Sequence, residues 1–301
     1  MDTMLPLLTI SQSVRQALEA NQPLVALEST VITHGLPYPQ NLALARDMEA
    51  EVAAKGATPA TIAVLKGVVH VGLTSDELDI LAMGEEMMKI SVRDFAPAIL
   101  HKKSGGTTVA GTLMVAHAAG IKVFATGGIG GVHREAPFDV STDLTMLGKT
   151  PLVVVCAGAK AILDLPATLE MLETLGVPVV GYQTDEFPAF YSRTSGLSVS
   201  TRADSPEEIA AIARLHWKLG MNSAVLVAQP PPEGAALEGQ DVEDAIREAL
   251  EESKKKNIRG QAVTPFLLKQ VSDLTLGSSL QANLALLVNN ARLAAQVARA
   301  L

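Results

Sequence analysis

The sequence predicts an α/β fold with a mostly buried sheet, and three features carry this prediction. Strand-like apolar runs alternate with helical patterns along the whole chain, which is typical of proteins whose helices cover a central sheet. Hydrophobic residues make up 48% of the 301 residues and aromatic residues only 3%, so we expect a core of Ala, Val, Leu and Ile. Because no repeat or low-complexity tract interrupts the chain, we expect a single domain over residues 1–301.

The first half of the chain predicts a short buried strand followed by an amphipathic helix. Residues 24–27 are uniformly apolar. Residues 41–55 carry apolar side chains at helical spacing, and Gly56 provides the stop. Farther on, residues 61–65 and 68–71 flank a Lys-Gly pair, the signature of a hairpin.

Two β-branched runs near the middle of the chain, 122–125 and 152–156, read as central strands. The second half then carries the stronger helix signals. Pro166 and Gly176 bound a helix over 167–175, with the proline at the start and the glycine past the end. A capping-box pattern begins another helix at Ser205. The remaining expected elements are strands over 177–181 and 224–228 and a terminal helix over 279–300.

Charge and composition exclude several classes of function. The net charge of −8 lacks the basic footprint of a protein that binds nucleic acid polymers. Charged residues are only 19% of the chain, below the usual share of about 25%, so we expect partner subunits to cover part of the surface. The uncharged stretches 104–121 and 274–291 contain glycines, histidine or amides, so neither resembles a membrane-spanning helix.

The single Cys156 cannot form an internal disulfide, which fits a reducing compartment, and we expect a cytoplasmic protein. The apolar run around this cysteine predicts a buried structural thiol. Because no basic region precedes the first apolar residues, no secretory signal is expected.

The segment 125–134 is the richest in chemical signals. Four glycines within five residues follow a strand, and they allow the backbone to approach a ligand closely. The segment does not match the dinucleotide fingerprint, because the third glycine of that pattern falls on His133. His133 and Arg134 place an imidazole and a guanidinium beside the loop, a combination suited to an anion. A tight structural turn is the alternative interpretation.

Asp139 and Asp143 are spaced so that they share a face whether the segment is helical or extended. Two carboxylates with the hydroxyls of Ser141 and Thr142 between them suit a hard divalent ion such as Mg²⁺ or Mn²⁺. They equally suit the hydroxyls of a sugar, and residues of these types also cap helices.

Lys160 and Glu28 each follow a predicted buried strand, where α/β folds place their sites. Poor solvation at that position favours a neutral amine at Lys160, which attacks carbonyl groups. A half-buried carboxyl at Glu28 would have a raised pKa and would serve as a general acid. A lysine that extends to solvent and an ordinary strand-end glutamate are the alternatives.

Three weaker signals complete the candidate set. Lys89 and Arg93 offer two cations for a phosphate, and residues 105–109 form a glycine–hydroxyl turn that would open a helix toward an anion. Asn283 and Asn290 share one face of the terminal helix among leucines. Buried amides need partners, and a ligand is one candidate partner.

These segments together resemble the pseudouridine-5′-phosphate glycosidase family, also called the indigoidine synthase A-like family. The resemblance covers nearly the whole chain, and its motifs are long and occur in the family's order. The matching segments are 27–30, 33–39, 89–94, 105–109, 126–134, 138–143, 155–160, 181–190, 264–268 and 279–291.

The resemblance implies reversible cleavage of the C–C glycosidic bond of pseudouridine 5′-phosphate to uracil and ribose 5-phosphate, a reaction of nucleotide catabolism. The family's Schiff-base lysine matches Lys160, which would bond to C1′ of the opened sugar, and its proton donor matches Glu28. The metal, expected to be one Mn²⁺ per subunit, falls on Asp139. The implied substrate contacts are Lys89, Val109, His133, Ser141, Thr142, Asp143 and Asn283.

The resemblance also implies a three-layer α/β/α sandwich with a mostly parallel or mixed sheet, assembled as a homotrimer. Two other functions remain open on the sequence. The first is an imine-forming lyase or nucleosidase that acts on another phosphosugar. The second is a non-enzymatic phosphosugar-binding accessory protein, although the presence of both Glu28 and Lys160 argues against a pure binder.

Overall fold

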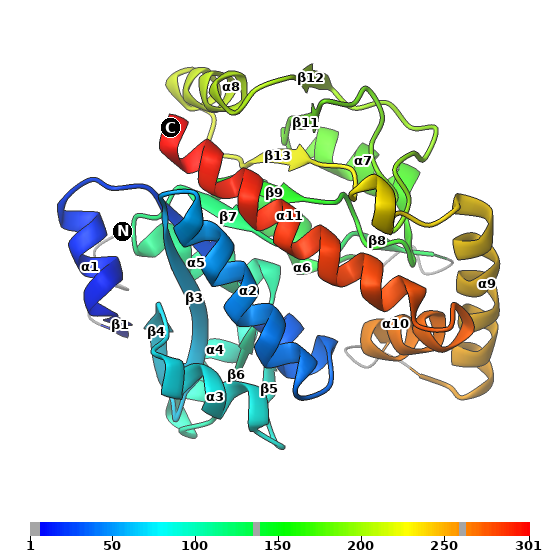
Figure 1. Ribbon diagram of the computed structural model, residues 1–301, viewed down its shortest axis with the longest axis horizontal. Coiled ribbons are helices and arrows are strands. Elements are labelled where there is room, and N and C mark those ends of the chain that lie inside the picture. Colours follow the sequence, from blue (N-terminus) through cyan, green and yellow to red (C-terminus); the bar gives the residue numbers. More distant parts are fainter. Residues whose placement is uncertain (1–6, 135–138, 259–262) are drawn as a thin grey trace.

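The centre of the molecule is a mixed sheet of eleven strands with helices on both faces (Figure 1). This computed structural model describes residues 7–134, 139–258 and 263–301. The main path of the sheet runs β1-β4-β3-β2-β7-β9-β13-β11-β12, and β6 pairs with both β3 and β5. The strands are β1 (Leu8–Ile10), β2 (Leu24–Leu27), β3 (Thr58–Leu65), β4 (Val68–Val71), β5 (Met88–Ile90), β6 (Gly105–Thr107), β7 (Val123–Ala125), β9 (Val153–Cys156), β11 (Val179–Tyr182), β12 (Thr201–Ala203) and β13 (Val225–Ala228). A separate antiparallel pair joins β8 (Val132–His133) to β10 (Leu163–Asp164).

The strands from β3 through β2, β7, β9, β13 and β11 to β12 are all parallel to their neighbours. Every residue of β2, β7, β9 and β13 is buried, as expected for strands covered by helices on both faces. The α/β class, the mixed sheet and the layered architecture predicted from the sequence are therefore confirmed.

Helices connect the strands and cover the two faces of the sheet. The longest, α11, packs along α2 and α8 and lies on β2, β7 and β9 (Figure 1). On the other face, α5 packs against α6 and the sheet. The helices are α1 (Gln12–Glu19), α2 (Gln40–Ala54), α3 (Ser75–Met83), α4 (Phe95–Leu100), α5 (Val109–Ala118), α6 (Thr142–Leu147), α7 (Leu165–Thr174), α8 (Pro206–Lys218), α9 (Gly239–Lys255), α10 (Val263–Leu274) and α11 (Ser278–Ala300).

The hairpin predicted around the Lys-Gly pair is present. β3 and β4 pair antiparallel, and Lys66 and Gly67 both adopt positive φ angles, of 51° and 79°. Two central residues of this kind make the turn whose twist matches that of the flanking strands. The strand before the turn is longer than predicted, because it continues back to Thr58 at the start of β3.

Two local predictions need correction. Residues 105–107 form a buried strand instead of a turn, and only Thr108 caps the helix that follows. At α8 the predicted cap at Ser205 is confirmed, since its hydroxyl accepts the backbone N–H of Glu208. Only the reciprocal bond of the capping box differs, because the Glu208 carboxylate accepts the N–H of Asp204 instead of that of Ser205. Within the described ranges, no helix combines the length and the apolar character that a membrane crossing requires.

Candidate active site

A cavity of about 400 Å³ opens beyond the carboxyl ends of β2, β7 and β9. These three strands are parallel neighbours in the sheet, so the residues that follow them meet at one edge. Glu28 directly follows β2, the glycine-rich loop follows β7, and Lys160 follows β9. All the catalytic, substrate and metal residues that the family resemblance implies line this cavity: Glu28, Lys89, Val109, His133, Asp139, Ser141, Thr142, Asp143, Lys160 and Asn283.

Glu28 is almost fully enclosed, with 7% of the residue exposed. The hydroxyl of Thr126 donates to Oε1, and the hydroxyl of Thr30 lies 3.2 Å from Oε2. Burial raises the pKa of this carboxyl above its ordinary value; the charge of Lys160 and the bond from Thr126 oppose that rise, and Asp143 adds to it. A carboxyl with a raised pKa retains its proton closer to neutral pH, as a general acid requires.

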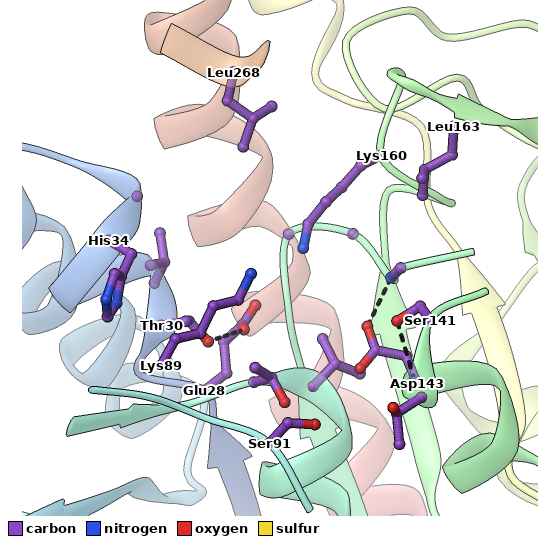
Figure 2. Close-up of a pocket in the computed structure, with 18 of the residues that line it drawn as sticks. Glu28, Thr30, His34, Lys89, Ser91, Ser141, Asp143, Lys160, Leu163 and Leu268 are labelled. Carbon is purple, nitrogen blue, oxygen red and sulfur yellow. Dashed lines mark hydrogen bonds between the residues drawn. The ribbon is translucent and has the colours of Figure 1, made fainter. Parts of the chain in front are cut away.

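Two amines face each other across the cavity. Figure 2 shows the side chains of Lys160 and Lys89 converging on the space above Glu28 from opposite walls. Neither ammonium group forms a hydrogen bond or ion pair with a side chain in the described ranges. Burial lowers the pKa of Lys89, and the positive charge of Lys160 lowers it further. Two unpaired amines in one enclosed space favour an anionic or carbonyl ligand between them.

Two helices begin at the cavity wall. Thr108 caps α5 and Ser141 caps α6 through their hydroxyls. The first backbone N–H groups of these helices, at Val109 and Thr142, donate to no partner among the described residues. Free N–H groups at helix N-termini bind anions, since the helix dipole adds to their hydrogen bonds. This arrangement gives the apolar Val109 a physical basis as a binding residue, because its backbone supplies the donor.

Asp143 has a structural role that the sequence did not reveal. The residue is 6% exposed; its Oδ1 accepts the N–H of Ala110 at 2.9 Å, and its Oδ2 accepts that of Gly130 at 2.8 Å. One side chain therefore ties the start of α5 to the glycine-rich loop. Because both of its oxygens accept backbone N–H groups, Asp143 ties two parts of the fold together, and the metal site expected from the spacing of Asp139 and Asp143 stays a prediction.

The glycine-rich loop passes too close to its neighbours for side chains. A Cβ at Gly130 would lie 2.3 Å from the Ser141 hydroxyl and 2.7 Å from Asp143 Oδ2, and one at Gly128 would lie 2.6 Å from the Phe190 ring. These glycines let the loop approach the α6 cap on one side and an aromatic ring on the other. The structure assigns no tight turn to residues 127–131, and none of their glycines has a positive φ, so close packing explains the glycines better than a turn does. Gly127, Gly128 and Gly130 line the cavity, and their contact with a ligand stays a prediction.

Asp139 is exposed on the cavity wall, and its carboxylate makes no hydrogen bond within the described ranges. The described residues contain no group of three or more His, Cys, Asp or Glu side chains placed to hold a metal ion. A single free carboxylate still fits Mn²⁺ or Mg²⁺, because such ions retain several waters and often bind one or two protein carboxylates together with substrate phosphate. Nearby, burial lowers the pKa of His133, and the negative charge of Asp139 opposes that shift.

Two of the weaker sequence candidates serve the fold. The guanidinium of Arg134 donates to the carbonyls of Leu163 and Ala161 and pairs with Glu243, so it ties β10 and the segment before it to α9. Asn290 is 1% exposed and donates to the carbonyls of Thr126, at 2.9 Å, and Gly127, at 3.4 Å. The partner of this buried amide is therefore the backbone of the glycine-rich loop.

Sequence reasoning missed several residues that shape the site. It gave no role to Thr30 and Thr126, whose hydroxyls approach the carboxyl of Glu28, or to Phe190, which lines the cavity. Thr126 directly follows β7 just as Glu28 follows β2, and that shared position was the available signal. Phe190 gave no signal, because its left-handed backbone, with φ of 64°, appears only in the structure.

Comparison with known proteins gives concordant matches. The model of a family described as indigoidine synthase A like protein matches residues 13–300. A pseudouridine-5′-phosphate glycosidase of Paracoccus denitrificans is 53% identical, over 98% of this chain and 99% of its own length. A protein of the same name from Geobacillus kaustophilus is also 53% identical, over 98% of both chains.

Two solved structures share the fold over nearly their whole length. The prealnumycin C-glycosynthase AlnA, in complex with ribulose 5-phosphate, superposes with a TM-score of 0.90 at 41% identity, covering 97% of this chain and 96% of its own. An indigoidine synthase A-like protein from Thermotoga maritima superposes with a TM-score of 0.89 at 35% identity, covering 97% and 95%. The similarity therefore extends over the full set of elements that form the cavity.

Proposed function

The chain belongs to the indigoidine synthase A-like family, and from that membership we propose that it cleaves the C–C glycosidic bond of pseudouridine 5′-phosphate reversibly, giving uracil and ribose 5-phosphate. One observation carries the proposal: the unpaired amine of Lys160 and the buried carboxyl of Glu28 face one enclosed space. A nucleophile and a proton donor together are what a C–C glycosidic bond requires, since its leaving group is a carbon.

The phosphate is held at the part of the cavity wall that the two helix starts form. Val109 and Thr142 offer their free backbone N–H groups there, and Lys89 supplies a positive charge. A lysine ammonium group together with backbone N–H groups at helix N-termini suits a phosphate dianion. The complex of the related C-glycosynthase with ribulose 5-phosphate supports a five-carbon sugar phosphate as ligand of this architecture.

The chemical step begins at Lys160. The nitrogen lone pair of its amine attacks C1′, the bond from C1′ to the ring oxygen breaks, and that oxygen takes the N–H proton that the attacking nitrogen releases. The nitrogen lone pair then forms a C=N bond as the C–C bond breaks, and the bonding pair leaves with the uracil carbon. Glu28 gives its proton to that carbon, and water hydrolyses the imine to ribose 5-phosphate and the free lysine.

Asp139 is the residue that would hold one Mn²⁺ ion, through its free carboxylate on the cavity wall. When bound, the ion would supply positive charge that orients and neutralises the substrate phosphate. The wall around it is completed by His133 and Ser141, which also line the cavity.

The assembly and location expected from the sequence form part of this proposal. A homotrimer accords with a chain in which charged residues are only 19%, and a cytoplasmic location accords with its single buried thiol. Sedimentation equilibrium at micromolar concentration tests the assembly, and a monomer across that range contradicts it.

The substrate is tested by comparing pseudouridine 5′-phosphate with uridine 5′-phosphate, which presents the same sugar phosphate and base through a C–N bond. We expect uracil release from the former at least a hundredfold faster than from the latter, and loss of that release in Lys160→Ala. Cleavage of uridine 5′-phosphate alone would show a nucleosidase. Binding of ribose 5-phosphate without turnover of either nucleotide would show a phosphosugar-binding protein.

A further inference from the structure

The carboxyl group of Glu28 has a different hydroxyl beside each of its oxygens. Thr126, at the end of β7, donates to Oε1 and has no other acceptor within the described ranges. Thr30, two positions after Glu28 on the same segment, has its Oγ1 3.2 Å from Oε2. The two oxygens are therefore in chemically distinct surroundings, although both are buried.

The single hydrogen of the Thr30 hydroxyl has a nearer acceptor than Glu28. Oγ1 lies 2.5 Å from the backbone carbonyl oxygen of Thr107, against 3.2 Å from Oε2. A carbonyl oxygen can only accept, so the hydrogen must point toward Thr107 for that contact to be a hydrogen bond. The lone pairs of Oγ1 then remain available toward Oε2, and that contact is satisfied only when Oε2 carries a proton.

We propose that Thr30 is a positioning residue that accepts a hydrogen bond from the protonated carboxyl of Glu28 and thereby keeps the transferable proton on Oε2. The inference rests on the proposed role of Glu28 as proton donor. Thr126 supports it from the other side, because its donation to Oε1 marks that oxygen as the carbonyl-like one. The carboxyl thus presents one defined proton to the cavity.

The balance of the proton step follows from this arrangement. The Oε2–H bond breaks, its electron pair stays on the carboxylate, and the proton goes to the uracil carbon. Once Oε2 has lost its proton, the hydroxyl of Thr30 can donate a hydrogen bond to it only by giving up its shorter hydrogen bond to the carbonyl of Thr107. Thr30 therefore favours the protonated acid over the carboxylate, and it promotes reprotonation of Oε2 at the end of the cycle.

Three charged groups face Glu28 besides these hydroxyls. The positive charges of Lys160 and Lys89 favour the carboxylate, and the negative charge of Asp143 favours the acid, as does burial. None of the three forms a hydrogen bond with Thr30 among the described residues. Substituting Thr30 leaves these charges in place. The direction in which the titration of Glu28 then shifts therefore reports the effect of the Thr30 hydroxyl alone.

The test compares two matched substitutions, Thr30→Val and Thr126→Val, in the free enzyme. The protonated carboxyl of Glu28 is followed by infrared spectroscopy over a pH series, with Glu28→Gln identifying its band. Thr126→Val removes a donor to the carboxylate, so the titration of Glu28 should move to higher pH. Thr30→Val removes an acceptor for the acid, so the titration should move to lower pH, by about one pH unit for one hydrogen bond.

Thr30→Ser keeps the hydroxyl and should restore the wild-type titration, and Thr30→Ala provides a second variant without a hydroxyl. A shift to higher pH in Thr30→Val or Thr30→Ala, or no shift, overturns the inference. The infrared titration needs no substrate, so its result is separate from the proposed function. If wild-type protein fails to release uracil from pseudouridine 5′-phosphate, the proposed function falls whatever the titration shows.

Discussion

The hydrogen bonds of Asp143 predict an unusually large effect for one isosteric substitution, Asp143→Asn. The carboxylate accepts two backbone N–H groups, from Ala110 at 2.9 Å and from Gly130 at 2.8 Å. An amide has one acceptor oxygen, so in either orientation its NH₂ group faces one of these N–H donors. The substitution therefore removes one charge-assisted bond and leaves one backbone donor buried without an acceptor.

The magnitude follows from these two losses. A hydrogen bond to a charged group contributes about 1.5–3 kcal/mol, and an unsatisfied buried donor costs about 1–3 kcal/mol. We expect the free energy of unfolding to fall by about 3–5 kcal/mol, combining the central parts of both ranges. At about 2 °C per kcal/mol, the lower end of the scale for larger domains, Tm should fall by about 6–10 °C.

The matched control is Asp139→Asn, the same chemical change four positions earlier on an exposed carboxylate without a hydrogen bond among the described residues. Its free energy of unfolding should stay within about 0.5 kcal/mol of the wild-type value. Urea unfolding and thermal circular dichroism, both without metal or phosphate, measure the two variants side by side. Equal midpoints for the two variants would refute the assignment of Asp143 as the tie between α5 and the loop.

Three further predictions concern other buried or exposed groups. Burial raises the pKa of Glu28 in the folded protein, so the free energy of unfolding falls as pH rises through that raised pKa. Above the raised pKa, Glu28→Gln should therefore unfold at a higher temperature than wild type. This difference in Tm should shrink as pH falls toward 4.5, the ordinary pKa of the group. A constant gap across the pH series would contradict this. Cys156 is 0% exposed and burial raises its pKa to about 12, so Ellman's reagent should find no thiol in the native protein at pH 8 and one after unfolding in guanidinium; a fast native reaction would show that the site opens. Asp139→Ala should lose any stimulation of turnover by Mn²⁺ while keeping its fold, and an unchanged metal response would place the ion elsewhere.

The sequence predicted the parallel centre of the fold well because that part is determined locally. β2 is a continuous apolar run that begins and ends at the predicted residues, and β7, β9 and β13 each begin only one residue later than expected. Strands buried on both faces must be apolar throughout, so their pattern is visible in the sequence alone. Their order in the sheet also brings Glu28 and Lys160 to the same edge.

The strand β6 could not be predicted, because its glycines signal a turn and their true cause is long-range. A Cβ at Gly106 would lie 2.5 Å from the backbone oxygen of Ser29 and 2.5 Å from the hydroxyl of Thr33. Glycine is needed there for close approach of two chain segments, which a local reading cannot distinguish from a turn.

The sequence predicted which residues line the candidate cavity better than it predicted what each of them does there. Asp139 and Asp143 looked equivalent from their spacing, yet one carboxylate is exposed and each oxygen of the other accepts a backbone N–H. That difference arises from the start of α5, which is distant in the sequence. Thr30 and Thr126 were missed for the same reason, since the significance of a hydroxyl depends on what lies across from it.

The central claim is that Lys160 forms a covalent imine with the sugar. Incubation with ribose 5-phosphate and borohydride, followed by peptide mass mapping, tests it directly. We predict one ribosyl phosphate adduct per chain on Lys160, absent in Lys160→Ala and retained in Lys89→Ala, although the latter needs more ribose 5-phosphate. An adduct on Lys89 instead, or no adduct in a preparation that releases uracil from pseudouridine 5′-phosphate, would contradict the account.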